Sequence, residues 1–267
     1  MMRTSLTVAL LSILLTTMLG CTSTAVVGRA PGGAEIVRIP LRLSNVHLVR
    51  TSTPVLIDSG TLGDMDDLRR ALDDYGVRPS DLRLVILTHG HADHSGLAAD
   101  LRRATGARIM LGAGDLGLAR AGHNDELMPT GFMGTVLKPF ITSEYPEFVP
   151  DLVVRDRIDL APWGIQGSAI AMPGHTAGSV VVVMSDHSAF VGDMMLGGSF
   201  GGQIGASSPG EHYYQADRAQ NRRNIQTLLG MGIEKFYLGH GGPVARADVI
   251  AAFVDRADGR QSAALPP

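Results

Sequence analysis

The chain has 267 residues, of which 45% are hydrophobic and 18% charged, and its formal net charge is −3. This composition argues against a disordered or fibrous protein, and the length suffices for one globular domain with a substantial core. Because there is no broad positive charge, we expect no nucleic-acid partner held by phosphate neutralisation. A small-molecule substrate fits better, and the sequence leaves the oligomeric state open.

The N-terminal residues have the pattern of an export signal. A short polar start with Arg3 leads into "LTVALLSILLTTML", an apolar stretch too short for comfortable membrane spanning. We therefore expect residues 1–20 to be a signal peptide. Residues 21–34 are rich in small side chains with no pattern for packing, and we expect them to form a flexible tether.

Cys21 is the only cysteine of the chain, so it has no disulfide partner within the chain. The stretch "MLGC" around it resembles a bacterial lipobox, in which the cysteine is lipidated and becomes the mature N-terminus. The resemblance implies an exported protein of the bacterial cell envelope that contacts the membrane only through a lipid anchor at Cys21. Thr22 after the cysteine favours the periplasmic face of the outer membrane. An ordinary signal peptide or a single anchor helix is the alternative.

The folded part starts with alternating strand and helix patterns. Short β-branched segments predict strands at 35–43, 46–50 and 54–60. Apolar residues at helical spacing, with acidic residues in the first turn, predict a surface helix at 63–76. A buried strand, a helix and a further strand are predicted at 82–88, 92–106 and 107–111. This order predicts a layered α/β fold.

The alternation of predicted strands and helices is interrupted at the start of the second half of the chain. Residues 112–163 contain scattered Gly and Pro, and we expect them to form an insertion near the active site. Further strands are predicted at 164–172, 178–185, 188–192 and 235–239. Helices are predicted at 213–229 and 246–257.

Histidines and an aspartate are concentrated in "LTHGHADHSG", residues 87–96, directly after a predicted buried strand. Imidazole nitrogens and carboxylate oxygens are the ligands of zinc-like divalent metals. His89 and His91 are two positions apart in an extended segment, so their side chains point the same way. Asp93 and His94 follow where the chain turns into the helix, and are aimed at a second position. These four residues are an incomplete site.

Further ligands are available at His175, Asp193 and His240, each at the end of a predicted strand and next to a glycine. In α/β folds, active sites are built at strand ends. Two metals bridged by a carboxylate and a water would polarise a carbonyl or phosphoryl oxygen and supply hydroxide near neutral pH. The residues therefore indicate hydrolytic chemistry.

The successive motifs "HGHADH", "PGHTAGS", "GD" and "GH" resemble those of the metallo-β-lactamase-fold hydrolases. The resemblance implies an αβ/βα sandwich of two mixed β-sheets flanked by helices, within a domain at 35–267. It implies two divalent metal ions, with zinc expected and iron or manganese as alternatives. The implied ligands are His89, His91 and His175 for one metal, Asp93, His94 and His240 for the other, and Asp193 as the bridge between them.

The remaining histidines have no convergent partners in the sequence. We expect His47, His123 and His187 to be structural or solvent-facing. His212, with Tyr213 and Tyr214, follows the glycine-rich stretch "GGSFGGQIGASSPG", predicted to be a flexible loop beside the site. These three residues are candidates for hydrogen bonds to a substrate oxygen. Helix capping or packing is an equally good interpretation.

The family resemblance narrows the range of possible substrate classes. Members that open β-lactams generally lack an aspartate at the position of Asp193, whereas glyoxalase II enzymes and acyl-homoserine lactonases have one. Glyoxalase II enzymes add a helical glutathione-binding domain after the last histidine, and only a short segment follows His240 here. Lactonases share the metal ligands and a nearby tyrosine, and residues 112–163 could cover an acyl chain.

We therefore expect a dinuclear metal-dependent hydrolase of a small ester, thioester or lactone. In the expected mechanism a metal-bridging hydroxide attacks the carbonyl, and Asp93 acts as the catalytic residue that moves the proton to the leaving group. Two alternatives stay open. One is a β-lactamase-type amide hydrolase or a phosphodiesterase on the same fold, and the other is a non-enzymatic, lipid-anchored metal-binding protein of the envelope.

Overall fold

The computed structural model describes residues 23–255. The predicted signal peptide at 1–20, the predicted lipidation site at Cys21 and the end of the last predicted helix lie outside the described residues. Within the described range, every helix is too short or too polar to cross a membrane.

The first sheet has seven strands in the order β1-β2-β3-β4-β5-β6-β7. Strands β1 to β4 pair antiparallel, and β4 to β7 pair parallel. The parallel strands β4 and β5 are buried along their whole length, as expected where both faces of a sheet are covered. The strands are β1 (Ala25–Arg29), β2 (Glu35–Pro40), β3 (Asn45–Arg50), β4 (Val55–Ile57), β5 (Leu84–Ile86), β6 (Arg108–Gly112) and β7 (Leu152–Val154).

The second sheet has six strands in the order β15-β14-β11-β10-β9-β8. Its neighbours pair antiparallel except β11 and β14, which are parallel, so this sheet is also mixed. The strands are β8 (Arg157–Asp159), β9 (Gly167–Ala171), β10 (Val180–Met184), β11 (Ser188–Gly192), β14 (Lys235–Leu238) and β15 (Val244–Ala245).

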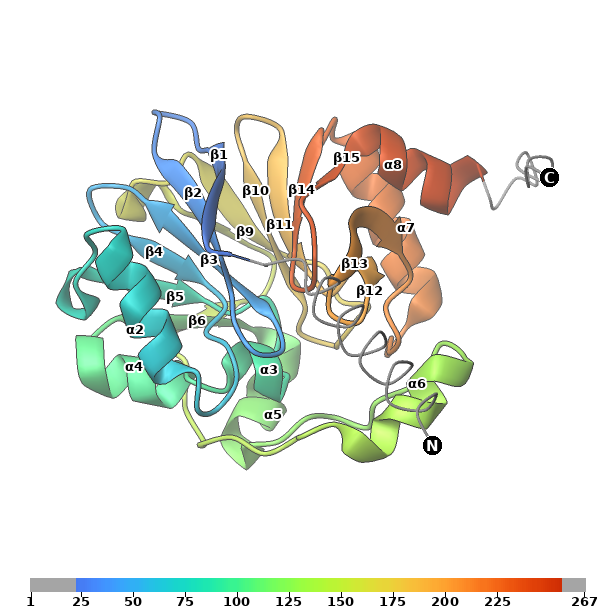
Figure 1. The fold of residues 1–267 in the computed structure, drawn as a ribbon, viewed down its shortest axis with the longest axis horizontal. Helices are drawn as coiled ribbons and strands as arrows, with labels where there is room; N and C mark the ends of the chain where they lie inside the picture. Colours follow the sequence, from blue (N-terminus) through green and yellow to red (C-terminus); the bar gives the residue numbers. More distant parts are fainter. Residues whose placement is uncertain (1–22, 256–267) are drawn as a thin grey trace, which may run out of the picture.

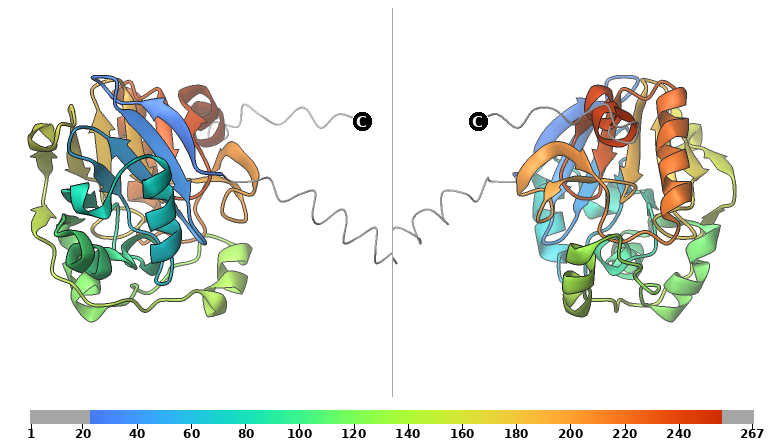
Figure 2. Two further views of the ribbon diagram at one scale, coloured as in Figure 1. Left: turned by 60° about the vertical axis from the view of Figure 1, so that its left-hand side comes forward. Right: turned by 90° about the vertical axis from the view of Figure 1, so that its right-hand side faces the viewer.

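Helices cover the outer faces of the two sheets (Figures 1 and 2). Helices α2 and α4 lie against the first sheet, and α7 and α8 lie against the second. The structure thus confirms the predicted αβ/βα sandwich. The helices are α2 (Met65–Asp74), α3 (Ala92–Ser95), α4 (Ala98–Thr105), α5 (Leu116–Ala121), α6 (Phe132–Leu137), α7 (Arg218–Gly230) and α8 (Arg246–Ile250).

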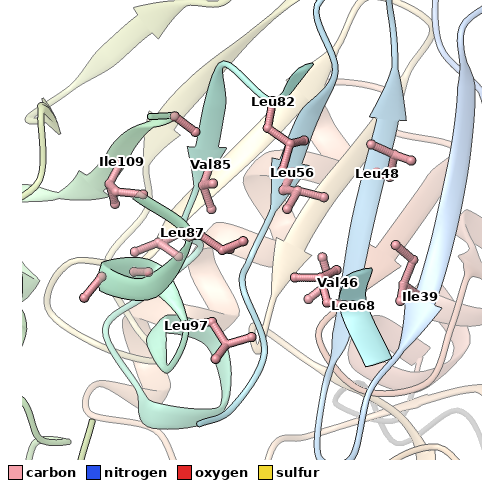
Figure 3. Close-up of a cluster of buried hydrophobic side chains, with 14 of the residues drawn as sticks. Ile39, Val46, Leu48, Leu56, Leu68, Leu82, Val85, Leu87, Leu97 and Ile109 are labelled. Carbon is pink, nitrogen blue, oxygen red and sulfur yellow. The ribbon is translucent and has the colours of Figure 1, made fainter. Parts of the chain in front are cut away.

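The core has one apolar layer between the sheets and one layer on each outer face. Figure 3 shows part of the layer under the helices of the first sheet, where Leu68 from α2 and Leu97, just before α4, join Val46 and Leu56 of the sheet. Side chains on alternate positions of a strand point to opposite faces, so one strand serves two layers. In β3, Leu48 faces the helices and Val49 faces the second sheet.

Strand β1 shows that the prediction of a flexible tether at 21–34 is wrong for residues 25–29. Ala25 pairs with Arg38 and Arg29 with Glu35 in an antiparallel ladder. The ammonium of Lys235 also donates a hydrogen bond to the carbonyl of Val27, at 2.6 Å. The strand is held by backbone hydrogen bonds at the sheet edge, and its small side chains give little apolar patterning in the sequence.

The predicted helix at 92–106 is divided into α3 and α4. The carbonyl of His94 accepts hydrogen bonds from the Ser59 N–H, at 2.8 Å, and from its hydroxyl, at 2.7 Å. The Leu97 N–H is 3.2 Å from the same hydroxyl oxygen. Ser59 therefore satisfies groups that a continuous helix would pair internally, and the break fixes the position of His94.

Two irregular segments contain more regular structure than predicted. Residues 112–163 were predicted to form an insertion, but β7 and β8 within this range belong to the two main sheets. The insertion is therefore limited to residues 113–151, between β6 and β7. The glycine-rich stretch at 197–210, predicted to be a flexible loop, lies in the antiparallel hairpin of β12 (Leu196–Ser199) and β13 (Ile204–Gly210). Backbone pairing decides these elements, and glycine-rich side-chain patterns do not reveal it.

Candidate metal centre

The seven predicted ligands come from four places along the chain that meet at one end of the sandwich. The loop after β5 carries His89, His91, Asp93 and His94. The turn between β9 and β10 carries His175, and Asp193 and His240 follow β11 and β14 closely. The strand-end placement expected from the sequence thus brings residues more than 100 positions apart into contact.

The side chains form three overlapping groups in which the potential ligand atoms lie within 4.8 Å of one another. Two of the groups match the ligand sets implied by the sequence, and the third includes a residue outside those sets. The groups are His89, His91 and His175; Asp93, His94, Asp193 and His240; and His175, Asp193 and His212.

Asp193 is a member of the second group and also faces the first, as a bridging carboxylate would. Its Oδ2 is 3.2 Å from Nε2 of His240, 3.8 Å from Nε2 of His175 and 3.9 Å from Nε2 of His89. Its Oδ1 lies 3.4 Å from Nε2 of His94, which belongs with His240 to the second group. The carboxylate therefore presents an oxygen to both groups.

The donor atoms fit a divalent metal. Among the described residues, His89 Nε2 and Asp193 Oδ1 are buried without a hydrogen-bond partner. A buried polar atom without a partner costs about 1–3 kcal/mol, which ligation to a metal would offset. Imidazole and carboxylate together suit zinc, iron and manganese, so the donor set leaves the identity of the metal open.

Hydrogen bonds behind the imidazoles select the nitrogen that faces the centre. His94 Nδ1 lies 2.9 Å from Oδ2 of Asp58, and His91 Nε2 lies 2.9 Å from Oδ1 of Asp125. His175 Nδ1 lies 2.9 Å from the carbonyl oxygen of Tyr214. A ring N–H that donates to such an oxygen leaves the other nitrogen free as a ligand. This arrangement turns Nε2 of His94 and His175, and Nδ1 of His91, toward the centre.

The two carboxylates that orient these imidazoles, those of Asp58 and Asp125, were not predicted from the sequence. Asp58 directly follows buried strand β4, at the same sheet edge as the histidine loop, and this position was a usable signal. Asp58 also accepts hydrogen bonds from the N–H and hydroxyl of Thr88, which ties it to the loop. Asp125 lies in an irregular segment and carries no pattern that would single it out.

Another carboxylate, that of the buried Asp115, connects the histidine loops. It accepts hydrogen bonds from the Gly90 N–H at 2.8 Å, the Gly178 N–H at 2.8 Å and the Thr176 hydroxyl at 2.7 Å. Gly90 lies between His89 and His91, and Thr176 follows His175. One side chain therefore holds the two loops that supply the first ligand group.

The carboxylates and imidazoles strongly shift each other's protonation. Burial would raise the pKa of Asp193, but the facing imidazoles of His240, His94 and His212 outweigh it and hold that pKa well below its usual range. Burial would lower the pKa of His240, but Asp193 and Asp93 raise it to about 10. The pKa of His94 is also raised well above normal by its carboxylate neighbours, against the effect of burial. A metal must displace protons from these imidazoles, so its affinity increases with pH.

The three predicted substrate-contact residues, His212, Tyr213 and Tyr214, lie in different environments. His212 lies in the centre, with Nε2 3.1 Å from Oδ2 of Asp193. The Tyr214 hydroxyl donates to the carbonyl of Gly134 in α6, at 2.9 Å, so it is committed to packing rather than to the ligand cluster. Tyr213 is half-buried, and its ring centroid lies 6.1 Å from that of His212.

The other histidines lie outside the ligand groups, as predicted. His47 is buried, with its ring centroid 5.3 Å from that of Phe190 and 5.8 Å from that of Tyr237. His123 and His187 are exposed, and His187 occupies the turn between β10 and β11. The convergence of ligands is therefore specific to the positions in the strand-end motifs and to His212.

Comparisons with known proteins agree with this architecture. The family model of the metallo-beta-lactamase superfamily matches residues 39–240. Among solved structures, a metallo-beta-lactamase family protein from Thermus thermophilus superposes with a TM-score of 0.62 at 22% identity, covering 86% of this chain and 80% of that one. The native FEZ-1 metallo-beta-lactamase from Legionella gormanii gives 0.55 at 18% identity, covering 77% and 76%. At these identities the structures show a shared fold.

Curated relatives match over shorter regions. A hydroxyacylglutathione hydrolase from Methylobacillus flagellatus is 25% identical over 179 residues, which are 67% of this chain and 55% of the relative. Metallo-beta-lactamase domain-containing protein 1 from Rattus norvegicus is 49% identical over 43 residues, 16% of this chain and 17% of the relative. The chain thus spans about half the length of these relatives or less. The family model, the fold and the ligand motifs agree, and the chain belongs to the metallo-beta-lactamase superfamily.

Proposed function

We propose that this protein is a dinuclear metal-dependent hydrolase that acts on a small ester, thioester or lactone. The observation that carries the proposal is the position of Asp193 between two groups of imidazole and carboxylate ligands. The relatives named hydroxyacylglutathione hydrolase support carbonyl chemistry, because that name denotes hydrolysis of an acyl thioester.

Two divalent ions held by these residues would polarise a substrate carbonyl and lower the pKa of water toward neutrality. Asp193 would offer an oxygen to each ion, since its buried carboxylate faces His89 and His175 of one group and His94 and His240 of the other. Asp58, Asp125 and the carbonyl of Tyr214 hold the imidazoles in one orientation. Such prior orientation removes the cost of rearrangement during the reaction.

Asp93 is the residue proposed to move the proton. Its side chain is 25% exposed, so it is more accessible than Asp193. Its Oδ2 lies 3.2 Å from Nε2 of His240 and 3.5 Å from Nε2 of His94. Burial would raise its pKa, but these imidazoles hold the pKa well below its usual range, so the carboxylate is ionised but is a weak base. What suits it to carry a proton between the attacking water and a leaving group is its partly exposed position at the edge of the ligand cluster.

The segment around α6 supports a substrate with an apolar part. Phe132 and Phe140 are each 81% exposed, and Met128 is 51% exposed. The segment is hydrogen-bonded to the backbone beside His212, since the Thr130 N–H donates to the carbonyl of Tyr213 at 2.9 Å. Exposed apolar side chains on a segment that is hydrogen-bonded to the loop of His212 are suited to cover an acyl chain.

A substrate panel tests the proposal. The purified protein, loaded with two zinc ions per chain, is expected to hydrolyse an ester, a thioester or a lactone. A chelator should abolish the activity, and added zinc or manganese should restore it. The His89→Ala, His91→Ala double variant should lose both metal and activity, whereas the exposed control Asp66→Asn should keep both.

Other outcomes identify the alternatives. Hydrolysis of β-lactams or phosphodiesters alone would favour those two enzyme classes. Full metal loading with no hydrolysis of any panel member would contradict the enzymatic proposal and favour a metal-binding envelope protein.

We further propose that the protein is exported and lipid-anchored at Cys21. Palmitate labelling should occur in the wild type and be absent in Cys21→Ala. Equal labelling of both would contradict the lipid anchor.

A further inference from the structure

His212 lies inside the candidate centre although the seven-residue ligand set does not include it. It is 6% exposed, and its ring centroid lies 4.6 Å from that of His175. Its Nε2 is 3.1 Å from Oδ2 of Asp193, as close as the predicted ligand His240, whose Nε2 is 3.2 Å from the same oxygen. Two imidazoles thus approach one carboxylate oxygen from two different loops.

The backbone around His212 holds it in place. The Thr130 hydroxyl donates to the carbonyl of His212 at 2.7 Å, and the Gln215 N–H donates to the carbonyl of Met128 at 3.0 Å. Together with the bond between Thr130 and Tyr213, these contacts bind the loop before α7 to the segment before α6. The imidazole is therefore placed by a paired backbone segment, which favours a fixed geometry.

One carbonyl can orient two imidazoles. The Tyr214 oxygen lies 2.9 Å from Nδ1 of His175 and 3.1 Å from Nδ1 of His212. When both Nδ1 atoms carry the proton, both Nε2 atoms present lone pairs on the side of Asp193. This is the arrangement in which a backbone carbonyl fixes a metal-ligating histidine.

A second tautomer of His212 is also supported. The Tyr214 N–H donates to Nδ1 of His212 at 3.2 Å, and in that state the Nε2–H donates to Oδ2 of Asp193. His212 can therefore satisfy Asp193 as a hydrogen-bond donor or ligate a metal beside it. The change requires only that the ring proton moves from one nitrogen to the other.

We propose that His212 is an eighth metal-ligating residue, and that with His175 and Asp193 it forms an alternative metal position. This inference rests on the proposed metal centre. The alternative position shares His175 with the three-histidine group and Asp193 with the other group, so it adds a place for an ion without adding a third ion. A single ion can then occupy either the position of His89, His91 and His175 or that of His175, Asp193 and His212.

Metal titration of two variants tests whether His212 ligates a metal ion. His212→Ala removes the side chain, and His212→Gln supplies an amide that can donate to Asp193 but offers no imidazole. Metal-free protein is titrated with Co²⁺, whose visible absorption reports the ligand set, and zinc affinity is measured by competition with a chelator. We expect both variants to show an altered spectrum at one equivalent of Co²⁺ and to bind the first zinc ion more weakly, by about twofold if the ion divides equally between the two positions and by more if it favours that of His212. Both should still bind two ions at saturation.

A substitution at an exposed histidine outside the centre serves as the control. His187→Asn removes an exposed imidazole at a position with φ of 65°, which asparagine tolerates, and should match the wild type. Wild-type affinity and spectrum in His212→Gln would overturn the proposal and leave a hydrogen-bonding role, and unchanged values in both variants would overturn it as well. A wild type that binds no metal would instead contradict the metal centre itself. Circular dichroism of the metal-free variants checks that each is folded.

Discussion

The imidazole of His94 and the carboxylate of Asp58 lie 2.9 Å apart, measured from Nδ1 to Oδ2. Asp58 follows a strand of the first sheet and His94 lies in the first turn of α3, so this hydrogen bond joins two elements that meet only in the folded protein. The carboxylate holds the Nδ1 proton and thereby turns Nε2 of His94 toward Asp193.

Asp58→Asn should weaken metal binding without unfolding the protein. Asparagine tolerates the φ of 66° at this position, but its neutral amide is a poorer acceptor for the Nδ1 proton of His94. We expect the affinity for the ion held by the group of His94 to fall about 10–100-fold, as measured by chelator competition. Asp66→Asn is the matched control, because the Asp66 side chain is 92% exposed. Equal affinities in Asp58→Asn and the wild type would show that the bond does not orient the ligand.

Gly239→Ala should disrupt the centre through one added methyl group. A Cβ at residue 239 would lie 2.1 Å from Oδ1 of Asp193 and 2.6 Å from Cε1 of His94, so these side chains must move. We expect weaker binding of both ions, together with a loss of about 1–3 kcal/mol in the free energy of unfolding from overpacking. Isothermal titration and urea denaturation measure the two effects.

Gly230→Ala is the control for that substitution. Its added Cβ would have no described atom within 4 Å outside its local neighbours, and the position is at the end of α7. This variant should bind metal like the wild type and be as stable or slightly more stable, because alanine favours helix. If both alanine variants behave alike, steric contact at residue 239 is not the cause.

His47 should make the metal-free protein less stable at acidic pH. Burial, then the charges of Arg38 and His94, lower the pKa of His47 from 6.5 to about 3. Below pH 6.5 the unfolded chain binds a proton at this residue and the folded chain does not, so stability falls as the pH falls toward 3. We expect this residue alone to cost about 2 kcal/mol between pH 8 and pH 5.

Urea denaturation of wild type and His47→Leu at both pH values isolates this contribution. The variant should lose about 2 kcal/mol less than the wild type between pH 8 and pH 5, whatever its packing costs at a single pH. Identical pH dependence in the two proteins would show that the His47 pKa is not depressed in the folded state.

Phe132→Ser combined with Phe140→Ser should alter selectivity for apolar substrates. Both side chains are 81% exposed, so stability should change by less than about 0.5 kcal/mol per site. If they cover an acyl chain, KM for a long-chain ester should increase about tenfold, equivalent to about 1.4 kcal/mol, while KM for an acetyl ester stays unchanged. Met231→Ser, at the far end of α7, is the matched apolar-to-polar control. Equal effects on both esters would contradict a role in acyl-chain binding.

Local sequence patterns are sufficient to predict the layered fold and the residues at its strand ends. Alternating aliphatic segments, helical spacing and glycine next to histidine or aspartate are local signals, and each can be identified within about ten residues. The histidine loop after β5 was identifiable because its ligands are dense and its preceding strand is continuously apolar. His175, Asp193 and His240 were identifiable because each ends or borders a predicted strand.

The distant groups that complete the centre become visible only in the folded protein. Asp125 orients His91 from an irregular segment, and His212 reaches Asp193 from the loop before α7. Strand β1 and the β12–β13 hairpin likewise depend on backbone pairing, which the pattern of their small side chains does not predict. Hydrogen bonds and ligand geometry act over a few ångströms in space whatever the separation along the chain, so local sequence patterns cannot specify them.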